Sequence, residues 1–116
     1  MDLNKIPKIQ INNAKEFITS LPNQVKPEWL NGVDTNFHFD IEGDTGGQFS
    51  VIVNDNKMEV YEGFVGDPKC KITAKEKNFI NLLKGELNPM MAVFTGKVKI
   101  SNTSEIMKYA KLFGMM

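Results

Sequence analysis

The sequence predicts an α+β domain in which about five helices cover one face of a five-stranded, largely antiparallel sheet. Three successive segments alternate apolar and polar residues, which is the period of a half-buried strand, and short turns join them. Two further short strands are flanked by segments with the spacing of amphipathic helices. Strands grouped in one part of the chain are typical of α+β folds. With 116 residues, we expect one domain that spans 1–116.

The first three strands are expected at 37–42, 49–53 and 57–61. Turns rich in Gly, Asn and Asp separate them at 43–47 and 54–56. Antiparallel strands with such short connections form a meander that has one apolar and one polar face. The polar face carries four acidic residues: Asp40, Glu42, Glu59 and Glu62.

Two helical segments precede this meander. The first is expected at 13–21, where apolar residues recur at helical spacing. Asn12 or Asn13 is a good cap for it, and Pro22 is expected to end it. A second, shorter helical turn is expected after Pro27.

A fourth strand is expected at 70–74, after the loop that follows the meander. Thr73 is a candidate cap for the next helix, with Glu76 three residues later as its capping-box partner. This helix is expected to end before Gly85. Its apolar side consists of Phe79, Ile80, Leu82 and Leu83.

The last part of the chain contains two helices with a strand between them. Asn88 and Pro89 are the cap and first residue of a short apolar helix, which Gly96 ends. The fifth strand is expected at 97–100, and a last helix at about 103–113. Methionine is abundant here and suits a surface that adapts to guests of variable shape, although apolar residues at helical spacing are equally typical of an ordinary core.

Composition excludes several function classes. The net charge is zero, yet 34–67 holds eight acids and one lysine, whereas 68–116 holds nine lysines and three acids. All 14 basic residues are lysine, so the guanidinium group that nucleic-acid recognition relies on is absent, and no nucleic acid is expected. The chain has one cysteine and no apolar run near the length of a membrane span, and no secretory signal is expected. We expect a cytoplasmic protein.

Catalytic chemistry finds little support in the residues. His38 alternates with two core phenylalanines and is expected to be exposed on the polar face, whereas Cys70 shares the apolar face, so the two do not pair. The four acids of the polar face are expected to be solvated; a hydrolase that uses them is a remote alternative. The loop 43–47 lacks the Lys-Ser/Thr ending of a phosphate loop. The sequence indicates no enzyme, no metal and no cofactor.

Several motifs, in order, resemble the sterol carrier protein-2 (SCP-2) family. The sharpest lies at 85–100: Gly85, then Asn88-Pro89, then Ala92-Val93-Phe94, then Gly96-Lys97-Val98-Lys99-Ile100. It is similar to the family's Gly-x-x-Asn/Asp-Pro, Ala-x-Phe and Gly-Lys-Leu-Lys-Ile signature, with Val98 in place of leucine and Ser101-Asn102 in place of Gly-Asp. The resemblance spans about 14–113 and also includes four shorter matches: 37–43, 46–49, 60–63 and 67–74.

This resemblance implies a mixed sheet, helices over one of its faces, and between the layers a hydrophobic tunnel for fatty acids, fatty acyl-CoA or sterol-like lipids. Apart from the resemblance, the lysine-rich second half of the chain, Lys97 and Lys108 included, suits an anionic headgroup or membrane surface, and solvation alone explains these lysines equally well. The expected ligand-binding residues comprise a floor (Phe39, Ile41, Phe49, Val51), a wall (Phe79, Leu83, Met90, Met91, Phe94, Ile100) and a lid (Leu112, Phe113, Met115).

The sequence therefore predicts non-catalytic binding of lipids and leaves open whether the protein also transfers them. The alternative is a protein-interaction or dimerisation module with the same fold and a cavity filled by side chains; the sequence leaves the oligomeric state open. The two differ in one physical property. A carrier requires that the layer between sheet and helices be incompletely filled by the protein's own atoms.

Overall fold

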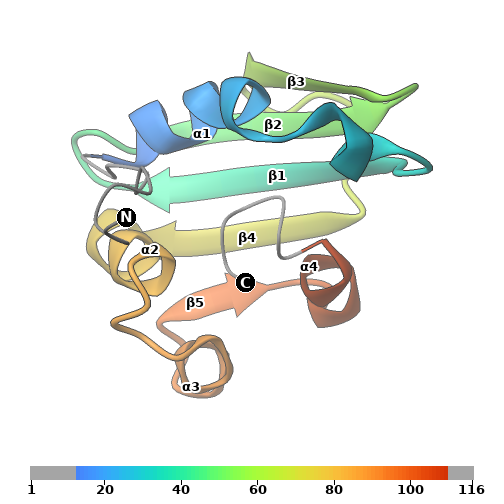
Figure 1. Ribbon diagram of the computed structural model, residues 1–116. Coiled ribbons are helices and arrows are strands. Elements are labelled where there is room, and N and C mark those ends of the chain that lie inside the picture. The colour runs from blue at the N-terminus through green and yellow to red at the C-terminus, as the bar shows by residue number, and fades with distance from the viewer. Residues whose placement is uncertain (1–12, 110–116) are drawn as a thin grey trace, which may run out of the picture.

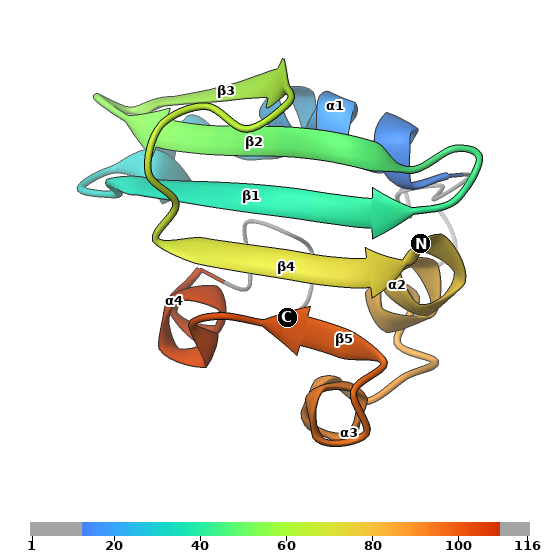
Figure 2. The same ribbon diagram turned by 180° about the vertical axis from the view of Figure 1, so that it is seen from behind.

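The computed structural model describes residues 13–109 and contains a five-stranded sheet in the order β3-β2-β1-β4-β5 (Figures 1 and 2). The central strand β1 pairs antiparallel with β2 and parallel with β4, and the other two pairings are antiparallel. The sheet is thus mixed and largely antiparallel, as expected. The strands are β1 (Thr35–Glu42), β2 (Gly47–Asn54), β3 (Lys57–Glu62), β4 (Cys70–Lys75) and β5 (Val98–Ile100).

Four α-helices and one 3-10 helix lie in the described part of the chain. Figure 1 shows α1, α2 and α4 in front of the sheet, and Figure 2 shows the opposite face without helices. In both views α3 lies beyond β5, at the edge of the sheet. The helices are α1 (Ala14–Gln24), η2 (Pro27–Leu30), α2 (Glu76–Leu83), α3 (Pro89–Phe94) and α4 (Thr103–Lys108).

The core forms between the apolar face of the sheet and the helices. Period-two alternation in β1 and β2 brings aromatic and branched side chains into register, with Phe37 opposite Val51 and Phe39 opposite Phe49. On the other side of β1, Phe39 is paired with Ile72 of β4. Cys70 is buried in this core as a small apolar residue, and burial raises the pKa of its thiol. The predicted meander and its apolar face are confirmed.

Pro22 does not end the first helix. The helix starts as expected, because the side chain of Asn13 accepts a hydrogen bond of 2.7 Å from Glu16 N. It continues to Gln24, and Val25 N closes the last turn on Leu21 O at 3.2 Å. Pro22 lies only two residues before the end of the helix, and burial of Ala14, Phe17, Ile18 and Leu21 holds the helix on the core.

His38 is not exposed, contrary to expectation. It does lie on the face of the sheet opposite the helices, but the connection between β3 and β4 crosses over it. Its ring stacks on Phe64 with centroids 4.8 Å apart, and Nε2 lies 3.0 Å from Val65 O. Ser50 ties down the same loop, since it donates to Gly63 O at 2.7 Å and accepts from Val65 N at 2.8 Å. The alternation of residues along a strand does not show whether a distant loop covers one of them.

Thr73 does not cap the second helix, because it lies within β4 and Lys75 occupies the cap position without a side-chain bond. Glu76 instead joins three segments. Its carboxylate accepts a short hydrogen bond from the Thr45 hydroxyl and one of 3.2 Å from Ala14 N. The glutamate therefore links the start of α2 to the β1–β2 turn and to the start of α1.

These bonds predict a pH dependence of stability. The Thr45 hydroxyl, and then Ala14 N, hold the pKa of Glu76 below its ordinary value of 4.5 in the folded state. A lowered folded-state pKa contributes stability that is present above the unfolded pKa and lost as the pH falls through the folded pKa. Glu76→Gln should therefore cost about 1 kcal/mol at neutral pH and progressively less below pH 4.5.

Urea unfolding of both proteins from pH 7 to pH 3 measures this difference. The exposed Glu86 supplies the control, and Glu86→Gln should change the free energy of unfolding by no more than about 0.5 kcal/mol. A constant difference between wild type and Glu76→Gln across the range would show that the carboxylate bonds do not contribute.

Candidate functional site

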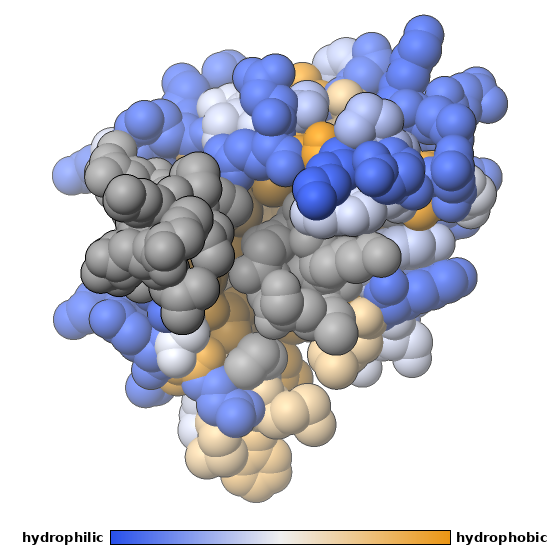
Figure 3. Space-filling model, viewed as in Figure 1, coloured by the Kyte–Doolittle hydropathy of each residue, from blue (hydrophilic) through white to orange (hydrophobic). Residues whose placement is uncertain are grey.

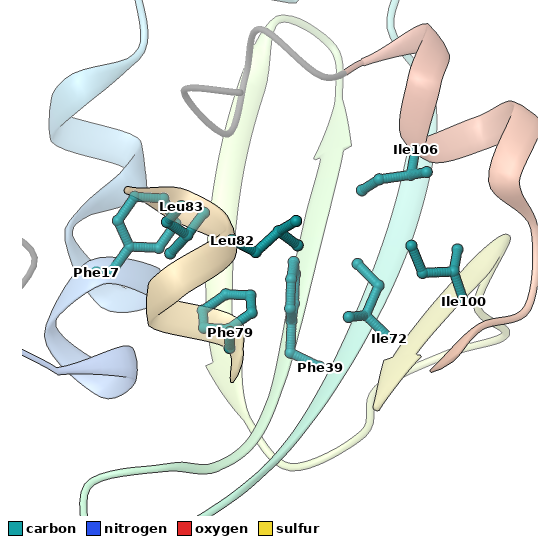
Figure 4. Close-up of a pocket in the computed structure, with 8 residues that line it drawn as sticks. All are labelled: Phe17, Phe39, Ile72, Phe79, Leu82, Leu83, Ile100 and Ile106. Carbon is teal, nitrogen blue, oxygen red and sulfur yellow. The ribbon is translucent and has the colours of Figure 1, made fainter. Parts of the chain in front are cut away.

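An entirely apolar pocket lies between the helices and the strands β1, β4 and β5 (Figure 4). In Figure 4 Phe39 and Ile72 rise from the sheet, with Leu82 on one side and Ile106 on the other. Among residues 13–109, eight line it: Phe17, Phe39, Ile72, Phe79, Leu82, Leu83, Ile100 and Ile106.

Helix α2 forms one wall of the pocket. Its residues 79, 82 and 83 have the i, i+3, i+4 spacing that places side chains on one helical face. Phe79 is 3% exposed and contacts two other rings edge to face, with centroids 6.1 Å from Phe17 and 5.8 Å from Phe39. These ring contacts and the Glu76 bonds hold α2 firmly against the sheet and α1.

Helix α4 forms the opposite wall and is held by fewer contacts. Asn102 caps it by accepting from Glu105 N at 3.1 Å, and Ile106 is its one buried residue. The Thr35 hydroxyl donates to the Glu105 carboxylate at 2.6 Å, which ties the helix to the first residue of β1. Of the two walls, α4 is therefore the one that can move away from the sheet at lower cost.

The pocket is small. Its cavity volume is about 20 Å³, which is room for about one water molecule. This pocket is thus much smaller than the tunnel that the resemblance implies. An alkyl chain therefore enters this pocket only if a wall moves outward.

The structure brings together part of the predicted site. Phe39, Phe79, Leu83 and Ile100 line the pocket, while Ile41, Phe49 and Val51 are buried in the core beside it. Leu112, Phe113 and Met115, the expected lid, lie outside the described residues. Four lining residues were not predicted: Phe17, Ile72, Leu82 and Ile106.

The expected position of the α3 residues is wrong. Met90, Met91 and Phe94 are 73%, 54% and 86% exposed and are not among the residues that line the pocket. The cap is as predicted, with the Asn88 side chain accepting from Met90 N at 2.9 Å. A helix of six residues presents only one side to the sheet, however, and that side is taken by the fully buried Ala92. The larger side chains consequently face away.

The described residues provide no metal site, no cluster of acidic side chains and no membrane-spanning helix. Among residues 13–109, no group of three or more His, Cys, Asp and Glu side chains is placed to hold a metal ion. The acids of the polar sheet face are spread over it: Glu42, Glu59 and Glu62 are exposed and Asp40 is half-buried. Within the same residues, no helix has the length and apolarity needed to cross a bilayer.

A mixed sheet with an apolar pocket beneath a helical layer defines the class of this domain. The family model described as "SCP-2 sterol transfer family" matches residues 11–114, so the chain belongs to that family. No curated protein matches the chain.

Solved structures share the fold at low sequence identity. The sterol carrier protein domain 2 of Helicoverpa armigera has a TM-score of 0.67 at 19% identity and covers 88% of this chain and 87% of its own. Palmitated SCP2L2 from Aedes aegypti has a TM-score of 0.62 at 22% identity, covering 84% and 88%. The sec-alkylsulfatase Pisa1 from Pseudomonas sp. has a TM-score of 0.70 at 14% identity over 88% of this chain, which corresponds to 16% of the sulfatase.

Proposed function

We propose that this domain binds, and transfers, a lipid with a long aliphatic portion, such as a fatty acid, a fatty acyl-CoA or a sterol-like molecule, without catalysing a reaction. The observation that carries the proposal is the lining of the pocket, in which all eight residues are apolar. Transfer of hydrocarbon from water to such a lining is favourable, and the lining offers no group for acid–base or nucleophilic chemistry. The palmitated relative from Aedes aegypti supports this choice of ligand.

Binding requires α4 to move, because the cavity of about 20 Å³ does not hold an alkyl chain. Each methylene removed from water contributes about 0.8 kcal/mol, so about fifteen of them supply roughly 12 kcal/mol before costs are subtracted. Outward movement of α4 loses the burial of Ile106 and the Thr35–Glu105 hydrogen bond, which together cost about 3 to 4 kcal/mol of free energy. The gain from the chain exceeds this cost, and a single headgroup bond adds only about 1 kcal/mol. Chain length, not headgroup, should set affinity.

Two measurements test this function. Protein from a heterologous host is extracted with organic solvent and the extract analysed by mass spectrometry, and the delipidated protein is titrated with a fluorescent fatty acid. We expect co-purified lipid and saturable binding that strengthens with chain length. If neither is observed, the domain is not a lipid carrier.

The small cavity favours a second candidate, a protein-interaction or dimerisation module whose layer stays filled. The Pisa1 match shows the same fold within a much longer chain. Light scattering over a range of concentrations separates the two. A mass that rises with concentration, without lipid uptake, favours the module.

A further inference from the structure

Three apolar side chains of α3 stand in solvent, and we name them the α3 tip: Met90, Met91 and Phe94. Their spacing, i, i+1 and i+4, places them on one side of the short helix. Figures 1 and 2 agree that α3 lies beyond the β5 edge, so the tip projects from the sheet. In Figure 3 apolar residues gather at the place of α3, at the bottom of the view. A contiguous and exposed apolar group of this kind marks an interaction surface.

A basic groove begins where the α3 tip ends. Lys75, Lys97 and Lys99 line an open depression with a cavity volume of about 300 Å³, which we name the lysine groove. Glu42 is the one acid among its lining residues, so the groove is net positive. Thr95 and Gly96, which directly follow α3, also line it.

The α3 tip and the lysine groove are held together by the backbone. Lys97 N donates to Ala92 O at 2.9 Å, and Thr95 N donates to Met91 O at 2.9 Å. These bonds hold Lys97 of the groove within about one turn of Ala92, the buried residue of α3. Insertion of the tip into a surface therefore brings the groove to the same surface.

We propose that the α3 tip and the lysine groove form a docking surface for an anionic lipid bilayer. Phenylalanine and methionine enter the boundary between headgroups and acyl chains, and the lysines bind the lipid phosphates or carboxylates above it. This inference rests on the proposed function, since it names the surface at which a carrier collects and delivers its lipid.

Charge and size both disfavour a second copy of the chain as the occupant. A two-fold contact through the α3 tip would bring two net-positive grooves toward each other. Three side chains are also a small part of the roughly 800 Å² that each partner of a stable interface buries. An anionic bilayer satisfies both features, because it accepts a small apolar insertion and neutralises the lysines.

Vesicle flotation with the full chain tests the proposal. The vesicles contain either phosphatidylcholine alone or phosphatidylcholine with phosphatidylserine. We expect binding to the anionic vesicles at low salt that weakens at high salt, and little binding to the neutral ones. Lys97→Gln/Lys99→Gln should weaken binding at least about tenfold, because each lysine near such a surface is worth about a fivefold change. Met90→Gln/Phe94→Gln should weaken it by a similar factor.

Matched controls lie elsewhere on the molecule. Met107→Gln is the control for the α3 tip, because Met107 is also an exposed methionine (60%) but lies on α4. Lys26 and Lys57, both exposed and far along the chain from the groove, are the control pair as Lys26→Gln/Lys57→Gln. These variants should bind vesicles like wild type. Circular dichroism verifies that each variant is folded, as expected for changes at exposed positions.

The fluorescent fatty acid titration separates this proposal from the proposed function. Variants of the α3 tip that lose vesicle binding but retain fatty acid binding support the docking surface. Vesicle binding that depends on the tip, in a protein that takes up no fatty acid, refutes the carrier and leaves the docking surface standing. Equal binding to neutral and anionic vesicles, no effect of the four substitutions, or a dimer that the tip variants dissociate would overturn the proposal.

Discussion

Replacing Leu83 with tryptophan is expected to weaken fatty acid binding by at least about tenfold while the domain stays folded. Leu83 lies at the end of α2, is only partly buried and lines the pocket, so a larger ring can occupy the space that the ligand needs. Excluding just two methylenes of the ligand costs about 1.6 kcal/mol, which already exceeds a tenfold change in affinity. The fluorescent fatty acid titration measures the effect.

Leu87→Trp is the matched control for this substitution. Leu87 is also a partly buried leucine packed on the core, but it does not line the pocket. Its replacement should leave fatty acid affinity within about threefold of wild type. Equal loss in both variants would show that the tryptophan acts through general destabilisation, and unchanged affinity in Leu83→Trp would place the lipid elsewhere.

The strands could be predicted because their physical signal is local. Alternation in 37–42 and 49–53 reflects burial of one sheet face, and that pattern is visible in the sequence. The turn at Asp55 and Asn56 could also be predicted, because Asp and Asn are common in hairpin turns. In the structure both residues adopt the positive φ (50° and 60°) that a two-residue hairpin turn requires. Cap residues act within three residues of themselves: Asn88 was predicted correctly, and Asn13 was one of the two candidates for the first helix.

The pocket could be predicted only in part because it depends on strand order. β4 pairs parallel with β1, which places Ile72 beside Phe39 and brings β5 and α4 to the same side. Nothing in the local pattern of residues 70–75 specifies that pairing. Ile106 and Phe17 were recognisable as inward-facing from helical spacing, but their meeting at one cavity follows from topology alone.

Long-range polar contacts were also invisible in the sequence. Glu76 looked like a capping residue for its own helix, but its partners are Thr45 and Ala14, 31 and 62 residues away. His38 follows the strand alternation, yet the Phe64 loop covers it. The methionines of α3 were expected in the wall of the cavity for another reason, since helical spacing alone does not show how much of a helix is covered. This short helix at the sheet edge buries the small Ala92 and leaves its large residues exposed.

Phe79→Ala is expected to have the largest effect on stability, lowering the free energy of unfolding by about 3 to 5 kcal/mol. The ring is almost fully buried between Phe17 and Phe39, so its removal loses two aromatic contacts and leaves a hole in the core. For a domain of this size the melting temperature should fall by at least about 12 °C. Phe64→Ala, on the other face and 40% exposed, is the control and should cost about 1 kcal/mol or less.

The same variant separates an adaptable pocket from a filled one. Removing Phe79 enlarges the apolar space at the pocket, so an added fatty acid should restore part of the lost packing. Because a ligand that binds only the folded state stabilises it by mass action, saturating fatty acid should raise the melting temperature of Phe79→Ala by more than that of wild type. Thermal melts with and without palmitate measure this difference. A hole that gains nothing from the lipid would mean that the layer beneath α2 does not accept hydrocarbon, and the filled-layer module would then be the better description of this domain.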